Sequence, residues 1–584
     1  MSAVPSTSAF RRPVPMYICV LLALAIHGPL LLMQLPLNSY DANFHIFFAS
    51  HYAKHWFDPW NVKWFAGFSQ TTYPPLVHQW IALLSHLVGL TFAFMLVQLT
   101  AVLLLVVGVY RFARLWVSER AASYASLAMV FVGTLAFLVY QAGQLPTVSA
   151  AALYVNAVPY FFDWSRKASF RALLKGVVLC LAAASVHHVT LIFGAALFAI
   201  PVIWLAIIDH AEAGDGSSAA IISRAVIFAV LVGAGVGIVL LPYWLAILKH
   251  PIKQIPIPHA SRANLLTNSV FLMNYFIVPY GLMILAFPFI LIRGAAERRL
   301  RPLLVFFWIT LIIGLGGTTP LPRWLFGRAF EILTFERFTL LATILALPIV
   351  GLLIETLIDR FRLKGVVAAS VAATATLAMA FAWLTLTPYS PQTQLNVQPV
   401  IAFLNRDDHN RYRYLTLGFG NTISKIATYT DANSIDGEYN SARLLPELTH
   451  YGSAQLTNSK FFGTAGMESL RAILKHANHY GLKYIFVHDS YYYPLIAFAG
   501  WRQVETFDNG QITVWSKEDV PPAHDIPTDA MPAPWEGVLW GILPIGSSIL
   551  AILLVLLLPA RERVAETVEF PVATGEHVYL REAK

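Results

Sequence analysis

The chain has 584 residues, of which 57% are hydrophobic and 12% are charged, and its mean hydropathy is +0.61. A soluble protein of this size carries about 25% charged residues, so the composition excludes a soluble globular protein and indicates a membrane protein. The formal net charge of +8 is spread over short clusters between apolar runs, which does not favour a nucleic-acid partner. Cys19 and Cys180 both lie in apolar runs, so neither a disulfide framework nor a cysteine zinc site is expected.

Apolar runs of about 20 residues recur along the chain, and each is long enough to cross a hydrocarbon core of about 30 Å as a helix. Met16 to Leu35 follows Arg11 and Arg12 like a signal peptide, but the run is long and lacks a small-x-small cleavage site. We therefore expect a retained first span. The apolar stretch 76–90 is short for a span and is expected to lie along the outer interface. About twelve spans are predicted, near residues 16–36, 92–112, 121–140, 147–163, 172–189, 190–208, 222–243, 270–292, 303–316, 339–357, 365–387 and 536–559.

Lys and Arg resist translocation, so the loops that hold them are expected on the cytoplasmic side. The loops after the even-numbered spans carry such clusters, for example Arg298-Arg299 and Arg360 with Arg362. This pattern predicts cytoplasmic N- and C-termini, with Arg561-Glu562-Arg563 on the inner side. The loops 37–91, 141–146, 244–269 and 317–338 and the segment 388–535 are then expected outside.

The first outer loop opens with Asp41, a few residues after a predicted span, where both water and a lipid phosphate can reach a carboxylate. On a helix, Asp41 and His45 are one turn apart and share a face. A carboxylate at this depth can act as a general base on an acceptor hydroxyl, most effectively if partial burial raises its pKa toward neutrality. The alternative is an interfacial helix cap or the partner of a nearby Arg.

The same loop is rich in histidine and aromatic residues. His51 and His55 have the i, i+4 spacing that lets two side chains share a metal, but no Glu follows the first His as zinc proteases require. A divalent metal is thus an open alternative to the common role of interfacial His, Trp and Tyr as anchors at headgroup depth. The other potential ligands are His45, Asp58 and His78.

His187 and His188 close the fifth predicted span on its outer side. Ionisable groups inside a membrane are costly, so they are candidates for a functional site. A hydrogen-bonded pair between helices is the alternative.

The loop 317–338 follows Gly316 and is unusual because it carries three arginines on the predicted outer side, against the positive-inside trend: Arg323, Arg328 and Arg337. A guanidinium binds phosphate through a bidentate fork and stays charged at an interface. The loop therefore predicts a polyprenyl phosphate or pyrophosphate ligand, unless Glu331 or Glu336 pairs with these arginines instead.

The polar segment 388–535 is predicted to form a small α/β domain outside the membrane. Its predicted elements are a strand over 413–417, a helix through Leu470, Ile473, Leu474 and Ala477 that ends at Gly481, and a strand over 484–487. Asp508-Asn509-Gly510, between short β-like runs at 504–507 and 512–515, predicts a hairpin, because Asn-Gly suits the positive φ angles of a type I′ turn.

The layout resembles the GT-C superfamily of integral-membrane glycosyltransferases. The likeness rests on Asp41 at the start of the first outer loop, Tyr73-Pro74-Pro75-Leu76 before the second span, about a dozen spans, and an outer α/β domain near the C-terminus. It implies three parts: a GT-C-like membrane module at 1–387, the outer domain at 388–535, and a last span with a cytoplasmic tail at 536–584. More narrowly, Gly316 to Pro320 and Phe335 to Phe338 resemble bacterial membrane proteins labelled 6-pyruvoyl-tetrahydropterin-synthase-related, although nothing in the sequence is expected to bind a pterin.

The GT-C resemblance implies transfer of a sugar from a polyprenyl-phosphate donor to an envelope glycan, lipid or protein acceptor outside the bacterial cytoplasmic membrane. Asp41 matches the family's catalytic acid, but Ala42 and Asn43 follow it, so the common paired-acid form is absent. The resulting hypothesis gives catalytic roles to Asp41 and His45. It assigns substrate binding to Arg323, Arg337, Glu336, His188, Tyr73 and Trp64.

Two other classes of function are open at this level. A transporter or flippase for a lipid-linked glycan would need a polar path through the membrane, commonly with internal repeats, and a non-catalytic assembly protein would hold Asp41 buried against an Arg. The sequence has no phosphate-binding Gly-Lys-Ser/Thr loop, no dinucleotide fingerprint and no Gly-x-Ser-x-Gly elbow. Direct ATP drive is therefore not expected.

Overall fold

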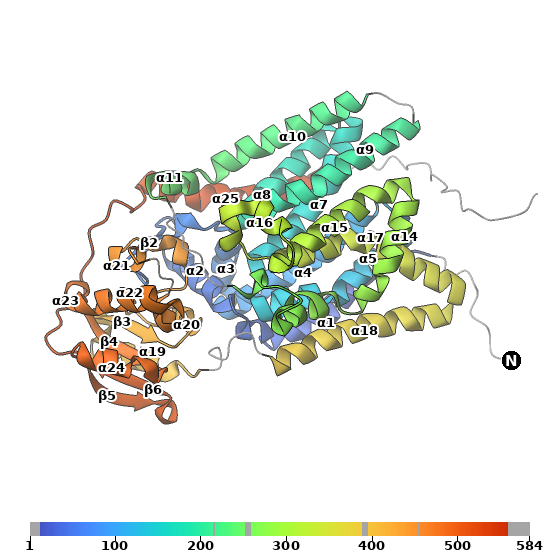
Figure 1. Cartoon of the computed structure of the whole chain (residues 1–584). Coiled ribbons are helices and arrows are strands. Elements are labelled where there is room, and N and C mark those ends of the chain that lie inside the picture. Colours follow the sequence, from blue (N-terminus) through green and yellow to red (C-terminus); the bar gives the residue numbers. More distant parts are fainter. Residues whose placement is uncertain (1–11, 214–216, 252–258, 388–394, 452–454, 559–584) are drawn as a thin grey trace, which may run out of the picture.

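The computed structural model describes residues 12–213, 217–251, 259–387, 395–451 and 455–558 (Figure 1). Arg11 and Arg561 to Arg563 lie outside these ranges. Within them, nine helical runs are long and apolar enough to cross a membrane, which confirms the predicted multi-pass helical protein. The runs are Leu90–Ala113 (α4), Glu119–Ala142 (α5 to η4), Leu145–Lys167 (α7), Phe170–Ala213 (α8 to α9), Ser218–Val239 (α10), Ser269–Ala296 (α12 to α14), Glu336–Phe361 (α17), Leu363–Leu386 (α18) and Pro534–Leu557 (α25).

Nine runs correspond to about twelve predicted spans for two reasons. The expected spans near 16–36 and 303–316 are shorter helices, α1 (Met16–Leu32) and α15 (Arg301–Gly314). The expected spans near 172–189 and 190–208 form one helical run of 44 residues, about 66 Å at 1.5 Å per residue, which is twice the thickness of a hydrocarbon core.

The chain reverses inside this long run at His187, whose backbone is extended (φ −161°, ψ 92°) between helical neighbours. Both ends of the run lie at the same face of the protein. Arg166 precedes its first residue, and Asp209 near its end is within electrostatic reach of Arg166 and forms an ion pair of 2.8 Å with Arg299. A single extended residue thus joins the two predicted spans.

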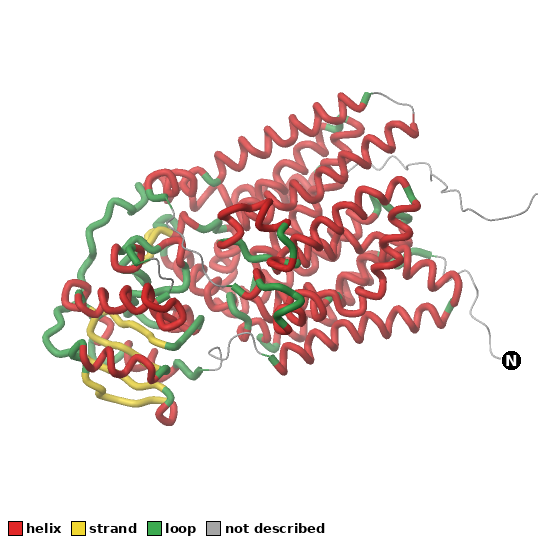
Figure 2. The backbone as a smooth tube through the Cα atoms, viewed as in Figure 1, coloured by secondary structure: helices red, strands yellow, loops and turns green. Residues whose placement is uncertain are grey.

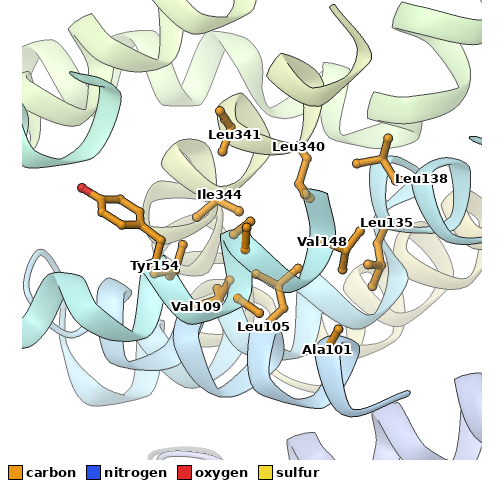
Figure 3. Close-up of a cluster of buried hydrophobic side chains, with 14 of the residues drawn as sticks. Ala101, Leu105, Val109, Leu135, Leu138, Val148, Tyr154, Leu340, Leu341 and Ile344 are labelled. Atoms are coloured by element: carbon orange, nitrogen blue, oxygen red, sulfur yellow. The ribbon is translucent and has the colours of Figure 1, made fainter. Parts of the chain in front are cut away.

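The interior of the helix bundle is apolar and close-packed. Figure 3 shows side chains of α4, α7 and α17 interdigitating, among them Leu105, Val148 and Ile344, all fully buried. In contrast, α10 and α18 bury few of their apolar residues and lie at the periphery of the bundle. Apolar side chains that face outward on such helices need lipid as their environment.

The α/β domain lies at one end of the bundle, and its sheet has the strand order β3-β4-β6-β5 (Figure 2). The strands are β3 (Arg413–Leu417), β4 (Leu482–Val487), β5 (Arg502–Phe507) and β6 (Ile512–Ser516). β3 and β4 are parallel, joined by α22 (Gly463–Lys475) and α23 (Ala477–Tyr480), and the other pairs are antiparallel. The predicted strands and the helical stripe ending at Gly481 are confirmed.

The β5–β6 hairpin is confirmed as well, and its turn has the predicted backbone. Asp508, Asn509 and Gly510 all have positive φ angles, of 51°, 53° and 89°. Asn and Gly tolerate this left-handed region better than other residues, so the local sequence fixes the turn.

The loops that carry the predicted cytoplasmic arginines lie at the end of the bundle opposite the α/β domain. The corners between α9 and α10 and between α17 and α18 are both at that end in Figure 1. There, Arg120 forms ion pairs with Glu355 and Asp359. The structure thus separates the basic loops from the α/β domain by the length of the bundle.

The first outer loop forms part of the core of the α/β domain. Trp64 is fully buried, and its ring packs against Phe47 of α2 (Ala42–Lys54) with centroids 4.0 Å apart. On the domain side, Trp64 packs against Gly437, where an added Cβ would lie 2.5 Å from the indole. The absence of a side chain at Gly437 lets the domain close over this ring.

We expect Gly437→Ala to lower the free energy of unfolding by about 1–3 kcal/mol, because the added methyl group overpacks the Trp64 contact. Thermal unfolding of the purified protein measures the change. Gly237→Ala is the matched control, since Gly237 lies in α10 with no atom near the new methyl group. Equal melting temperatures for the two variants would contradict the assigned packing.

Candidate functional site

The backbone around Asp41 is held by the end of the neighbouring helical run. The N–H groups of Tyr40 and Asp41 donate to the carbonyls of Gln141 and Ala142 at 3.0 and 3.1 Å. The next residue, Gly143, has φ +73°, and a Cβ there would lie 2.5 Å from Ser39 Oγ and 2.8 Å from the Asp41 nitrogen. Only glycine permits this close approach, so residues 39–41 are fixed against the bundle before their side chains make any contact.

The carboxylate of Asp41 has no close partner, but the charges of Glu336 and Arg337 act on it. Within the described residues it forms no hydrogen bond or ion pair. Burial raises the pKa of Asp41 to about 7, with a further upward contribution from Glu336 and a downward one from Arg337. A carboxylate with this pKa is poised for proton transfer near neutral pH.

Arg337 and Glu336 begin α17 and face the same region. The Nη2 of Arg337 donates to Thr334 Oγ1 at 2.7 Å, while its buried Nε has no partner among the described residues. Glu336 is 3% exposed; its Oε1 accepts a hydrogen bond from Gln144 Nε2, and its buried Oε2 has no partner in the described chain. Unsatisfied buried charge is costly, so both atoms keep hydrogen-bonding capacity that a ligand or water would satisfy.

His45 lies directly behind Asp41 on α2 and is buried. Its Nδ1 is 3.1 Å from Nε2 of His78 in α3 (Leu76–Val88). Burial lowers the pKa of His45 to about 3, so the ring is neutral at physiological pH. In this state it can hold a hydrogen bond but does not supply a proton as imidazolium.

Tyr73 and two adjacent histidines of α8, His187 and His188, are also within electrostatic reach of Arg337. The Tyr73 ring lies 6.4 Å from that of His187, and both Asp41 and Arg337 act electrostatically on Tyr73. His188 Nε2 is 3.1 Å from the hydroxyl of Tyr243, whereas His187 Nδ1 is 2.7 Å from Thr190 Oγ1. The break at His187 therefore places its own ring beside Tyr73 of the first outer loop, whereas the ring of His188 contacts Tyr243 and Trp244.

The remaining predicted site residues lie elsewhere. Arg323 is 66% exposed, forms an ion pair of 3.0 Å with Glu331, and stacks over Phe330. This is the internal pairing that the sequence left open as an alternative. Trp64 is buried in the aromatic core and not at the surface of the site. The structure thus gathers Asp41, Glu336, Arg337, Tyr73 and the histidine pair, with Arg323 outside that group.

Glu438 and Tyr439, which were not predicted from the sequence, are brought to the site by the α/β domain. The charges of Glu438 and Asp41 act on each other, and burial raises the pKa of Glu438, while a hydrogen bond from Ser424 opposes this. Tyr439 donates its hydroxyl to the Thr72 carbonyl at 2.6 Å. Asp436-Gly437-Glu438-Tyr439 is a visible acidic and aromatic run in the sequence, but nothing in it indicates its distant partner.

The histidines of the first outer loop are not arranged as the ligands of a metal ion in the described part of the chain. Over the described ranges, no group of three or more His, Cys, Asp or Glu side chains is arranged to hold a metal ion. His51 instead contacts the Asp58 carbonyl at 2.7 Å through Nε2, and the His51 and His55 rings lie 5.1 Å apart. The donor set therefore does not fit a closed metal site.

Comparison with known proteins identifies the fold. Neither a family model nor a curated protein matches the chain. The solved structure of the arabinofuranosyltransferase AftD from Mycobacteria is similar over 88% of this chain, with a TM-score of 0.52 and 14% sequence identity. Apo ArnT from Cupriavidus metallidurans has a TM-score of 0.50 and 12% identity over 85% of this chain and 97% of its own.

The match covers 40% of AftD, so this chain spans less than half the length of that protein. At these identities the likeness concerns architecture alone. The chain has the GT-C fold, a multi-pass helical membrane module with a small α/β region near the C-terminus, as the sequence predicted.

Proposed function

We propose that this protein is a glycosyltransferase that moves a sugar from a polyprenyl-phosphate donor to an acceptor on the outer side of the cytoplasmic membrane. The observation that carries the proposal is the unpaired carboxylate of Asp41, with a pKa of about 7, within electrostatic reach of the buried guanidinium of Arg337. The GT-C fold supports the same reaction class. An assembly protein would instead hold Asp41 in an ion pair, and no such pair occurs in the described residues.

In the proposed reaction, Asp41 takes the proton of an acceptor hydroxyl. The acceptor oxygen then forms a bond to the anomeric carbon of the donor, and the bond from that carbon to the phosphate oxygen breaks. The polyprenyl phosphate leaves with the electron pair. The proton remains on Asp41 until it is released to water, so the step needs no further reactant.

Arg337 is proposed to bind the donor phosphate. Its free Nε faces a buried environment, where a charge-assisted hydrogen bond to phosphate is strong. Because the charge of the leaving phosphate grows during bond cleavage, a fixed guanidinium stabilises the transition state more than the bound donor. Arg323, on the exposed side of the same loop, would contribute to attracting the anionic headgroup before it enters.

His45, His188, Tyr73 and Glu336 have positioning roles in this proposal. The neutral His45 orients the start of α2, and Glu336 raises the pKa of Asp41 through its negative charge. The outer α/β domain, with Glu438 and Tyr439 at the site, is proposed to select an envelope glycan, lipid or protein acceptor. The basic loops at the opposite end are then cytoplasmic, as the positive-inside rule requires.

Asp41→Asn is expected to lower sugar transfer by about 10²- to 10⁴-fold, because it removes the general base while keeping the side-chain shape. Transfer from a synthetic polyprenyl phosphosugar by the purified protein measures the effect, and donor binding should change little. Asp407→Asn is the control, since Asp407 is largely exposed on the outer domain. Normal turnover by Asp41→Asn would remove Asp41 from the mechanism.

The rate should depend on pH through the ionisation of Asp41. Because the base acts deprotonated and its pKa is about 7, kcat/KM should fall about tenfold per pH unit below 7 and level off above it. Glu336→Gln removes a negative charge that raises this pKa, so the acidic limb should move to lower pH. A limb that stays in place in the variant would contradict the proposed coupling between the two carboxylates.

Substitution of the two arginines should separate their contributions. Arg337→Gln is expected to weaken binding of polyprenyl phosphate by about 10- to 100-fold, the value of one or two buried charge-assisted hydrogen bonds. Arg323→Gln should weaken it by less than about fivefold, because exposed charges are screened. Microscale thermophoresis in detergent measures both affinities, with melting temperatures as a folding control. The opposite ranking would assign the phosphate to Arg323.

A further inference from the structure

A pocket lies where three distant segments of the chain meet. It has a volume of about 450 Å³ and is lined by the first outer loop, the α/β domain and the segment that leads into α25. Pockets of about 300–1,000 Å³ typically hold small ligands. Asp41, Arg337 and Tyr73 are not among its lining residues, so it is distinct from the site described above.

One wall of this pocket is the indole of Trp60, in β1 (Trp60–Asn61). The ring packs directly against Gly67, which has φ +123° and where a Cβ would lie 2.3 Å from the indole Cζ2. Phe65 lies in the same wall and is 1% exposed. The indole N–H donates no hydrogen bond to another described residue. Trp60 thus offers an aromatic surface together with a free donor.

The polar part of the lining is organised around Glu447 of the α/β domain. Its Oε1 is 2.6 Å from His476 Nδ1, and its Oε2 accepts a hydrogen bond of 2.7 Å from the Tyr480 hydroxyl. Burial acts to raise the pKa of Glu447, but the hydrogen bonds from Tyr480 and His476 bring it below its usual range. Each carboxylate oxygen can accept two hydrogen bonds, so Glu447 is held in place with acceptor capacity to spare.

The charge of the lining excludes one class of ligand. No Lys or Arg is among the described residues that line the pocket, and its single fixed charge is the carboxylate of Glu447. A phosphate or another anion would meet no Lys or Arg and would be repelled by Glu447, and of the two lining histidines His476 already contacts Glu447. A ring with apolar C–H faces and several hydroxyl donors fits better, because the C–H groups pack on Trp60 and the hydroxyls reach Glu447.

We propose that this pocket binds a neutral sugar residue of the acceptor glycan, at a unit distant from the one that receives the new sugar. The proposal rests on the proposed glycosyltransferase function. The pocket and the Asp41 site share the first outer loop: Trp64 follows Trp60 in that loop and packs on Phe47 of α2, the helix that begins after Asp41. A glycan held at Trp60 is therefore held by the same loop of the chain that begins with the general base.

The test is binding of the full-length purified protein to a printed array of neutral and anionic glycans. The best-binding oligosaccharide is then titrated by calorimetry into each variant. We expect binding to neutral glycans, and at least about tenfold weaker affinity in Trp60→Ala and in Glu447→Gln, equivalent to the loss of about 1.4 kcal/mol. Tyr491→Ala and Glu468→Gln are the matched controls, because both residues lie in the α/β domain outside the pocket.

The inference is overturned if the protein binds no glycan, if it prefers anionic glycans, or if both pocket variants bind as tightly as the unaltered protein. Two variants with different chemistry guard against a folding defect in either one. Asp41→Asn separates this inference from the proposed function, since it should bind the array normally. Full transfer activity in Asp41→Asn would overturn the reaction while leaving the pocket assignment in place.

Discussion

The arrangement at the end of the bundle next to the α/β domain depends on charged side chains that are buried or half-buried without close ion pairs. Asp41, Glu336 and Arg337 influence one another electrostatically, yet no ion pair joins them. Burying a charge costs several kcal/mol unless partners compensate. Part of this cost is offset by local hydrogen bonds, such as the one from the Gln144 amide to Glu336. Glu336 Oε2 and Arg337 Nε have no partner among the described residues, and in the proposed reaction the substrates would supply one.

The α/β domain and the membrane module share one aromatic core, so neither is a separate unit in the physical sense. Trp64 of the first outer loop is enclosed by Phe47 on one side and Gly437 on the other. The same part of the α/β domain brings Glu438 into electrostatic contact with Asp41 and places the Tyr439 hydroxyl on the Thr72 carbonyl. Displacement of the domain would therefore expose the aromatic cluster and also remove Glu438 and Tyr439 from the candidate site.

At His187 a single extended residue reverses the direction in which the chain crosses the bundle. Helical hydrogen bonding on both sides gives a continuous run, but its length exceeds what a membrane can accommodate in a single crossing. The extended backbone at His187 returns the chain to its starting face. This placement brings the imidazoles of His187 and His188 close to Arg337. A positively charged ring at either position would be repelled by the guanidinium.

Much of this fold could be predicted from local features of the sequence: apolar runs identified the spans, the Asn-Gly turn identified the hairpin, and short runs at 413–417 and 484–487 were predicted as strands. The position of Asp41 after a span also marked it as a candidate base. The sequence could not separate Arg337 from Arg323, because both lie in one loop, and only the tertiary packing buries the first and pairs the second with Glu331. Glu438 was equally out of reach, since its partner lies in the first outer loop and contacts between distant segments leave no periodic trace in either one.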